Sequence, residues 1–309
     1  MILHIFSVLA PIFGLILLGY GCRKTNRIGP TAAAELNRFV VWLCLPAMLF
    51  ESTATASVEE IWQPGFIWVI AIGTLAIFVA TIFYTMWRGR SLADAGLEAL
   101  SASYANTGYV GIPLCIFVLG EAGLEPALIA SLVVVCVLFA IAVVCVEVGL
   151  QAGQSVGVAI RKVSVALAKN PIVVTPIVGV LWNASGLGVN QGVLEFLHIL
   201  GTATIPCALV SLGAFLASKQ AGSAEGTMTL VFIKLIVHPV LTWVLAYQVF
   251  HLPPMWAKAA VLLSALPTGT GPYMLAELYQ REASVASRTI LLSTLGSLVT
   301  LTICLYLLP

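Results

Sequence analysis

The chain has 309 residues, of which 60% are hydrophobic and 9% are charged, and its mean hydropathy is +1.06. Soluble domains carry about 25% charged residues, so this composition excludes a soluble protein and indicates an integral membrane protein. The net charge of +1 gives no reason to expect nucleic-acid binding, and the expected surrounding is the lipid bilayer.

Ten apolar segments are expected to cross the membrane, because a helix needs about 20 apolar residues to do so. In chain order they cover residues 2–21, 36–52, 65–87, 92–119, 125–150, 170–186, 192–217, 227–251, 255–280 and 284–308. The second and sixth segments are short, and glycine and proline interrupt the fourth and the ninth. The first segment is expected to be a retained helix rather than a signal peptide, because no basic residue precedes it.

Basic residues gather in the odd-numbered loops and are almost absent from the even-numbered ones. They are Arg23, Lys24 and Arg27 in the first loop, Arg88 and Arg90 in the third, Arg161, Lys162 and Lys169 in the fifth, Lys219 in the seventh and Arg281 in the ninth. The positive-inside rule then places the odd loops in the cytoplasm and both termini outside it. We expect a multi-pass protein of the inner (plasma) membrane.

The two halves of the chain match at an offset of 160 residues. The matched pairs are Pro46 with Pro206, Ala105 with Ala265, and Gly111 with Gly271. Each half holds five expected spans, and this odd number forces the second half to enter the membrane upside down. The predicted fold is an all-α membrane protein of ten transmembrane helices in two inverted five-helix repeats. The repeats cover residues 1–150 and 170–309, joined by a cytoplasmic linker at residues 151–169.

The fourth and ninth segments are broken at equivalent depths, at residues 106–113 (NTGYVGIP) and 267–272 (PTGTGP). Non-helical backbone survives at membrane depth only where it is buried in protein or lines a wet cavity, so paired breaks point to a binding site near the midplane. Each break also starts a half-helix, whose free N–H groups and dipole favour an anion. The alternative is a pair of proline kinks that serve packing alone.

The candidate substrate-binding residues lie in these two breaks. They are Asn106, Thr107, Gly108, Gly111, Thr268, Gly269, Thr270 and Gly271. Pro113, Pro267 and Pro272 are the expected helix-break prolines, and Pro113 and Pro272 suit the first turn of the restarting half-helices.

Ionisable side chains within a span cost about 2.5–3.5 kcal/mol each, so each one needs a reason. Lys234 and His238 lie four residues apart on one face of the eighth segment. Lys234 is expected to attract an anionic substrate or to replace a bound sodium ion, the alternative being a side chain that reaches the membrane surface. His238 is a candidate for proton coupling, the alternative being a packed histidine. Glu98 and Glu277 are interpreted as exposed span ends, or else as carriers of a proton or cation.

No motif of a nucleotide-binding loop, a serine hydrolase or a zinc peptidase occurs, and the seven scattered cysteines are interpreted as small buried residues. We therefore expect neither an enzyme nor a cofactor or metal site. The coupling ion, where there is one, is expected to be H+ or Na+.

Four motifs resemble those of the auxin efflux carrier family: NTGYVGIP in the fourth segment, LPTGTGPYMLAELY in the ninth, LPAMLF in the second and KLIVHP in the eighth. The resemblance covers essentially the whole chain. It implies a fold like that of the bile acid sodium symporters, with helices four and nine broken and crossed. It also implies a scaffold domain and a transport domain, elevator-type alternating access, and a homodimer.

The same resemblance implies a substrate class, because members of this family move auxins in plants and malate, malonate or related carboxylates in bacteria. The chain lacks the long cytoplasmic loop of some plant members, which is typical of a short prokaryotic carrier. Gly271 stands where family members often have asparagine, and Thr270 is expected to substitute for it. The sodium sites of the bile acid transporters have no clear match, which favours proton coupling or uniport.

The sequence thus predicts a secondary transporter of small organic anions whose site lies where the two broken helices cross. One alternative is a sodium-coupled symporter of a bulkier organic anion. Another is a membrane sensor that binds a ligand without moving it.

Overall fold

The computed structural model describes residues 2–55, 63–150, 161, 164–165, 168–169, 171–217 and 225–308. These residues are helical almost throughout, and the pairing between Ala105 and Thr268 is an isolated antiparallel bridge rather than part of a strand. The all-α prediction is therefore confirmed for the described chain. Most of the expected linker, residues 151–169, lies outside the described residues.

Within the described residues, six helices are long and apolar enough to cross a membrane. They are Ala32–Thr55, Pro64–Trp87, Glu121–Leu150, Gln191–Leu216, Thr227–Val249 and Ser284–Leu307, and Thr107–Leu119 and Val174–Ala184 are shorter apolar helices. The second segment begins at Ala32, earlier than the expected residue 36. Glu35 and Arg38 occupy its first turns, so hydropathy alone starts the segment too late.

The chain forms two compact units, and each of them draws helices from both halves of the sequence. Unit 1 comprises Met1–Ile5, Pro64–Ser164 and Gln220–Pro309, and unit 2 comprises Phe6–Gln63 and Val165–Lys219. Spans three to five of the first half and eight to ten of the second thus fall in unit 1. The compact units therefore cut across the division into sequence halves.

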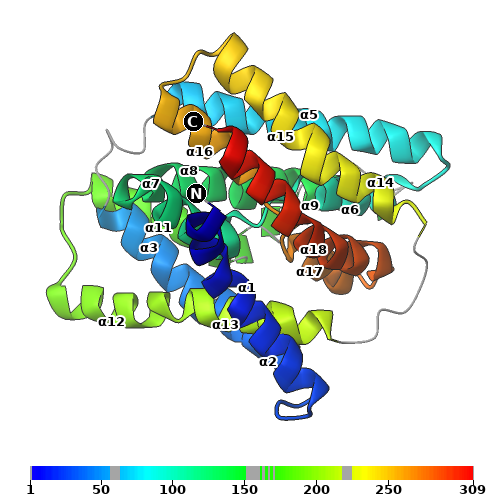
Figure 1. Cartoon of the computed structure of the whole chain (residues 1–309). Helices are drawn as coiled ribbons and strands as arrows, with labels where there is room; N and C mark the ends of the chain where they lie inside the picture. The colour runs from blue at the N-terminus through cyan, green and yellow to red at the C-terminus, as the bar shows by residue number, and fades with distance from the viewer. Residues whose placement is uncertain are drawn as a thin grey trace. The chain divides into compact units, whose positions relative to one another are not determined.

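Unit 2 consists of helices that pack in pairs. Its elements are α1 (Ile2–Lys24, from Phe6 on), α2 (Ala32–Phe39), the π-helical η1 (Val40–Cys44), α3 (Leu45–Thr55), α11 (Pro171–Ala184), α12 (Gln191–Thr202) and α13 (Thr204–Leu216). Helix α3 packs against α11 and α12, and α2 packs against α13 (Figure 1). Pro206 lies in the first turn of α13, where a missing N–H costs little, whereas Pro46 follows the π-helical turn η1 within the continuous helix Ala32–Thr55.

Helices α1 and α13 approach each other backbone to backbone at two glycines. A Cβ at Gly19 would overlap the carbonyl oxygen of Val210, and one at Gly213 would overlap the carbonyl oxygen of Ile16. Small residues let membrane helices come this close, and the gain is van der Waals contact rather than hydrophobic burial.

Unit 1 contains the two broken helices. Its elements are α5 (Pro64–Trp87), α6 (Leu92–Ser103), η2 (Thr107–Gly111), α7 (Ile112–Leu119), η3 (Glu121–Gly123), α8 (Leu124–Leu132), η4 (Val133–Leu138), α9 (Phe139–Leu150), α14 (Thr227–Phe232), η5 (Ile233–Val237), α15 (His238–Trp243), η6 (Val244–Val249), α16 (Pro254–Ser264), α17 (Gly271–Leu278) and α18 (Ser284–Leu307). Helix α6 packs between α5 and α9, and α15 lies beside α5 and α16 (Figure 1).

Most hydroxyl side chains inside these helices are satisfied locally, although the buried hydroxyls of Thr227, Thr294 and Thr300 have no partner among the described residues. Thr81 donates to the Ile77 carbonyl at 2.7 Å, and Ser103 donates to the Ala99 carbonyl at 2.7 Å. A hydroxyl bonded one turn back along its own helix needs no other partner, which lets buried Ser and Thr occupy an apolar interior.

The α1–α13 contact gives a test of the packing in unit 2. Gly19→Ala should lower the stability of the folded protein by about 1–3 kcal/mol, because the added methyl group meets backbone that has no room to move. Thermal unfolding of the purified protein in detergent measures the change. Gly14→Ala on the same helix is the matched control, since a Cβ there has no atom within 4 Å. Equal melting temperatures for the two variants would contradict the contact.

Candidate functional site

Both interruptions expected from the sequence are present in unit 1. Helix α6 ends at Ser103, the chain is extended at Tyr104, and the π-helical turn η2 leads into α7. Helix α16 ends at Ser264, and α17 starts again at Gly271. Each broken helix therefore consists of two half-helices joined by a short non-helical segment.

The two non-helical segments bond to each other in an antiparallel arrangement, which we call the crossover (residues 104–106 and 267–269). The Asn106 N–H donates to the Pro267 carbonyl at 2.9 Å, and the Gly269 N–H donates to the Tyr104 carbonyl at 3.0 Å. Ala105 and Thr268 form the bridge between these bonds. Backbone groups that a helix break would leave unpaired in an apolar medium thus satisfy one another.

Both the side-chain hydroxyl and the backbone N–H of Thr268 form hydrogen bonds that hold the crossover together. Its side chain is completely buried, and its hydroxyl donates to the Ser101 carbonyl at 2.8 Å. Its backbone N–H donates to the Ser293 hydroxyl, 3.0 Å away on α18. Thr268 therefore joins the two broken helices and α18, and its hydroxyl proton is already engaged.

Three of the four candidate glycines serve close packing. A Cβ at Gly269 or Gly271 would lie 2.9 or 2.8 Å from the ring of Tyr104. A Cβ at Gly111 would lie 2.8 Å from Leu266. Gly108 differs, because it is partly exposed and no atom lies within 4 Å of its Cβ position. Of the four, Gly108 is the one next to open space.

The three prolines of the breaks lie in different places. Pro272 is the second residue of the half-helix α17, where an absent N–H costs no helix hydrogen bond. Pro113 is the second residue of α7, but η2 runs into α7 without a gap, so this proline lies in the second turn of the restarted helix and not in its first turn. Pro267 contributes differently, since its carbonyl accepts the bond from the Asn106 N–H.

Asn106 carries an unsatisfied donor at the start of η2. Its side chain is only 4% exposed, and its amide nitrogen Nδ2 has no hydrogen-bond partner in the part of the chain that the structure describes. Its backbone carbonyl accepts from the N–H groups of Val110 and Gly111, at 3.1 and 3.0 Å. A buried amide left without an acceptor is costly, which points to a ligand that supplies one.

The neighbouring residues extend this donor set. Thr107 is buried beside Asn106, and its N–H bonds to the Ala105 carbonyl at 2.8 Å. Thr270 is half-buried before α17, and the acceptor that its hydroxyl finds in the described part of the chain is the sulfur of Met274, at 3.8 Å. A thioether is a weak acceptor, so this hydroxyl could turn to a better one. The Asn106 amide and the Thr270 hydroxyl are thus the side-chain groups of the breaks that could donate a hydrogen bond to a ligand.

Lys234 and His238 form a fully buried pair beneath the end of α16. The Lys234 ammonium donates to the Ser264 carbonyl at 2.6 Å, and it lies 3.3 Å from Nδ1 of His238. Lys234 is 0% exposed, so it does not reach the membrane surface. Ser264 is the last residue of α16, where carbonyls lack helical donors, so the ammonium caps a helix end whose dipole favours a cation.

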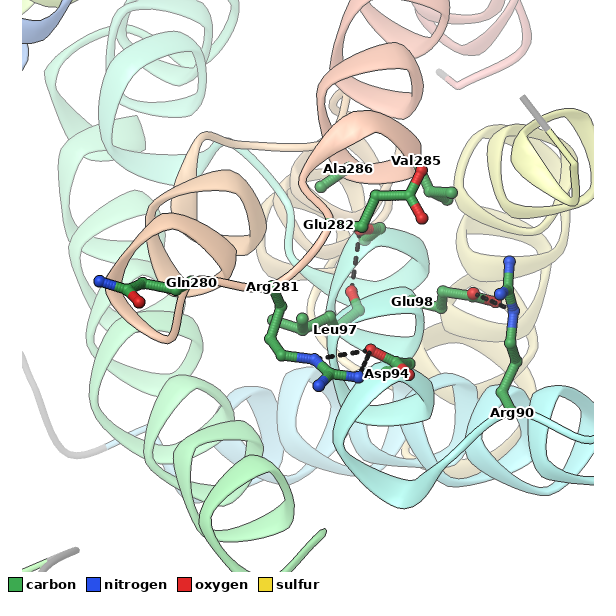
Figure 2. A pocket seen from close by; sticks show the side chains of 10 residues that line it. Arg90, Asp94, Leu97, Glu98, Gln280, Arg281, Glu282, Val285 and Ala286 are labelled. Atoms are coloured by element: carbon green, nitrogen blue, oxygen red, sulfur yellow. Dashed lines mark hydrogen bonds and ion pairs between the residues drawn. The ribbon is translucent and has the colours of Figure 1, made fainter. Parts of the chain in front are cut away.

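A charged cavity of about 260 Å³ lies at the start of α6, against the connection from α17 to α18. Arg281 binds Asp94 through two nitrogens, with Nη2 at 2.6 and 2.7 Å from the two carboxylate oxygens and Nε at 3.0 Å from one of them. Arg90 approaches Glu98 through Nε alone, at 3.0 Å. Figure 2 shows both pairs on the cavity wall.

The structure changes the interpretation of Glu98. We expected an exposed span end, but its side chain is buried on the cavity wall, because Arg90 folds back over the first turns of α6. The side chain of Glu277 lies outside the described part of the structure. Among the described residues, no three His, Cys, Asp or Glu side chains are grouped to hold a metal ion.

Several of these residues were not singled out by sequence reasoning. Tyr104 directly precedes the first break, and an aromatic residue at that point was the available signal. Ser293 and the Asp94–Arg281 pair have no local signal, because their partners are distant along the chain.

Comparisons with known proteins agree on one family. The sequence pattern of a family described as "Membrane transport protein" matches residues 4–305. The "Putative malonate transporter" of Rhizobium meliloti is 29% identical over 307 residues, which cover 98% of this chain and 96% of that relative. "Uncharacterized transporter YfdV" of Escherichia coli is 23% identical over 310 residues, which cover 96% of each chain.

A plant relative matches over a shorter stretch. "Auxin efflux carrier component 8" of Arabidopsis thaliana is 27% identical over 138 residues, which are 42% of this chain and 37% of that relative. The family pattern spans nearly the whole chain, and several apolar helices in the structure are long enough to cross a membrane. The chain is therefore a multi-pass membrane transporter that belongs to the membrane transport protein family, that of the auxin efflux carriers.

Proposed function

We propose that this chain is a secondary transporter of small organic anions and that it binds the anion at the crossover. The observation that carries the proposal is the buried Asn106 amide, whose Nδ2 donor finds no acceptor among the described residues at the point where a broken helix restarts. The first N–H groups of a helix also lack acceptors, and the positive end of its dipole lies there. A carboxylate would accept hydrogen bonds from the Asn106 amide and from these N–H groups, and the open space beside Gly108 would accommodate it.

The substrates that fit are mono- or dicarboxylates such as malonate or malate, or auxin-like acids. A relative named for malonate covers almost the whole chain, and another is named as an auxin efflux carrier component. Thr270 would supply a second hydroxyl from the facing break, and Lys234 would help to neutralise the anion from beneath α16. Thr107 and the backbone at 269–271 would complete the surroundings of the anion, with Thr268 holding the crossover in shape.

We further propose ten spans in two inverted repeats. The six long apolar helices would be joined by α1, α11 and the two broken helices. Ion pairs within unit 1 support this number of spans, because they join odd-numbered loops to one another. Arg88 of the third loop binds Glu225 of the seventh at 2.5 Å, and Arg281 of the ninth loop binds Asp94 beside the third. Odd loops meeting at one end agree with an inner-membrane protein whose termini both lie outside the cytoplasm.

Elevator-type transport by a homodimer is the corresponding proposal for mechanism. Unit 1 holds both broken helices, and unit 2 holds neither. A unit that carries the whole crossover could move as one body while the other serves as scaffold, which is a recurring arrangement for inverted-repeat transporters.

The alternatives differ in their ion requirement. In a sodium-coupled symporter a cation would be expected near the helix break, but the Lys234 ammonium already bonds the carbonyl that ends α16. This favours uniport or proton coupling over sodium coupling. The second alternative, a membrane sensor, would bind the anion without moving it, and uptake into liposomes separates the two.

Asn106 gives the sharpest mutational test. Asn106→Asp keeps the size of the side chain but replaces the free donor by a negative charge, so it should abolish carboxylate uptake while the protein still folds. Asn106→Ala should weaken binding about 10- to 150-fold, the loss expected for one hydrogen bond to a charged group. Uptake of radiolabelled malonate by proteoliposomes measures both.

Asn190→Asp is the matched control for that charge change. Asn190 is the N-cap of α12 in unit 2 and donates no bond to the crossover, and aspartate caps a helix equally well. This variant should transport as the unaltered protein does. Normal uptake by Asn106→Asp would remove the central claim.

Lys234 should matter for transport more than for stability. An ammonium buried without a carboxylate partner costs several kcal/mol in lost hydration, and methionine fills a similar volume. Lys234→Met should therefore unfold at the same or a higher temperature and yet lose most carboxylate uptake. A lower melting temperature with uptake intact would show that Lys234 serves only to hold the fold.

Ligand-dependent thermal stability tests the substrate class and the coupling ion together. A carboxylate present at about 100 times its Kd should stabilise the protein by about 2.7 kcal/mol. We expect this shift in sodium-free buffer. A shift that requires sodium would favour the symporter, and no shift with any mono- or dicarboxylate would exclude an anion site at the crossover.

A further inference from the structure

The charged cavity leads from the loop end of unit 1 toward the crossover. Ser101 lies on its wall, and the backbone carbonyl of the same residue accepts the Thr268 hydroxyl at 2.8 Å. The lining residues of α6 run from Asp94 to Ser101, seven residues apart, so the cavity extends about 10 Å along that helix. One residue therefore separates the floor of the cavity from the crossover.

The two arginines of the cavity are held with different strength. Arg281 makes a two-nitrogen bond to Asp94, which also accepts from the Ser91 hydroxyl at 2.7 Å. Planar two-point pairs of this kind are the strong ones. Arg90 contacts Glu98 through one nitrogen only, so its other two nitrogens are not used by that carboxylate. Arg90 is thus the guanidinium that an incoming carboxylate can engage.

If a ligand carboxylate replaced Glu98 on Arg90, the Glu98 carboxylate would lose its arginine partner. Its side chain is 11% exposed, whereas that of Arg90 is 38% exposed. A buried carboxylate that loses its one arginine contact has no compensation for its lost hydration, and it takes up a proton instead. The exchange would therefore convert the Glu98 carboxylate and one H+ into a neutral carboxylic acid, while Arg90 keeps its charge.

Other charges surround Glu98 and set the background of this step. They are Asp94 on its own helix, Arg88 and Arg90 in the loop before it, Glu225 before α14, and Arg281 and Glu282 between α17 and α18. Glu282 lines the same cavity but bonds the Ser284 hydroxyl at 2.6 Å. Changing Glu282 thus alters the charge of the cavity without breaking the Arg90–Glu98 pair.

We propose that this cavity is a second binding site for small carboxylates, a vestibule in which the ligand replaces Glu98 on Arg90 and Glu98 takes up a proton. The proposal rests on the proposed function, because it supplies the same class of anion to the crossover. It makes Arg90 a capture residue and Glu98 its competitor. Anion and proton then bind together, so each must raise the affinity for the other by the same factor.

The test measures binding of malonate to the purified full-length protein by calorimetry between pH 6.5 and pH 8. In Asn106→Asp, which should retain only the vestibule, binding should persist and strengthen toward low pH, by at most tenfold per pH unit for one linked proton. Adding Arg90→Gln should weaken it by about tenfold or more. Adding Glu98→Gln instead should strengthen malonate binding and remove its pH dependence, since the amide neither competes as a carboxylate for Arg90 nor takes up a proton.

Glu282→Gln in the same background is the matched control, and it should keep the pH dependence. If it behaves like Glu98→Gln, general charge and not the exchange controls the site, and the proposal is overturned. Malonate binding that is lost in Asn106→Asp alone would also overturn the vestibule while leaving the crossover site intact. Binding that depends on Arg90 but not on Asn106 would overturn the crossover site and leave the vestibule, and no binding to the unaltered protein would overturn both.

Discussion

Two backbone hydrogen bonds, from Asn106 to Pro267 and from Gly269 to Tyr104, are the constraint on which unit 1 depends. In lipid, every unpaired backbone group costs several kcal/mol, so each break needs hydrogen-bond partners from the rest of the protein. Each break supplies what the other lacks, provided that the two segments lie side by side. Glycine at 269 and 271 makes this possible, because any side chain there would collide with the Tyr104 ring.

The polar groups around the crossover divide into those that hold it and those left over. Thr268, Ser293 and the Ser264 carbonyl each have a partner. The Asn106 amide does not, although it is almost completely buried. Six other buried side-chain atoms also lack a partner among the described residues, but Asn106 is the one that lies in a helix break, where a ligand could complete the network. The same reasoning separates Arg281, which is held at two points, from Arg90, which is held at one.

Sequence reasoning located the two breaks because glycine and proline interrupt an apolar pattern whatever the tertiary structure. It could not tell which residues of a break bind each other. Thr268 looked like a free hydroxyl, but its partners lie 167 and 25 residues away on two other helices. Glu98 was interpreted as an exposed span end, because the sequence shows how close it lies to the loop but does not show that Arg90 folds back onto it. Local composition thus predicts where a helix fails, while the pairing depends on long-range packing.

The pairing of the two breaks also has a consequence in time. Tyr104 and Asn106 are synthesised about 160 residues before Pro267 and Gly269, their bonding partners. At about 5–20 residues per second, the first broken helix waits about 8–32 s for the second. During that interval its exposed N–H and C=O groups have to be hydrated or covered by other proteins. The rate of correct insertion should therefore depend on what protects the first half of the chain while the second is still being made.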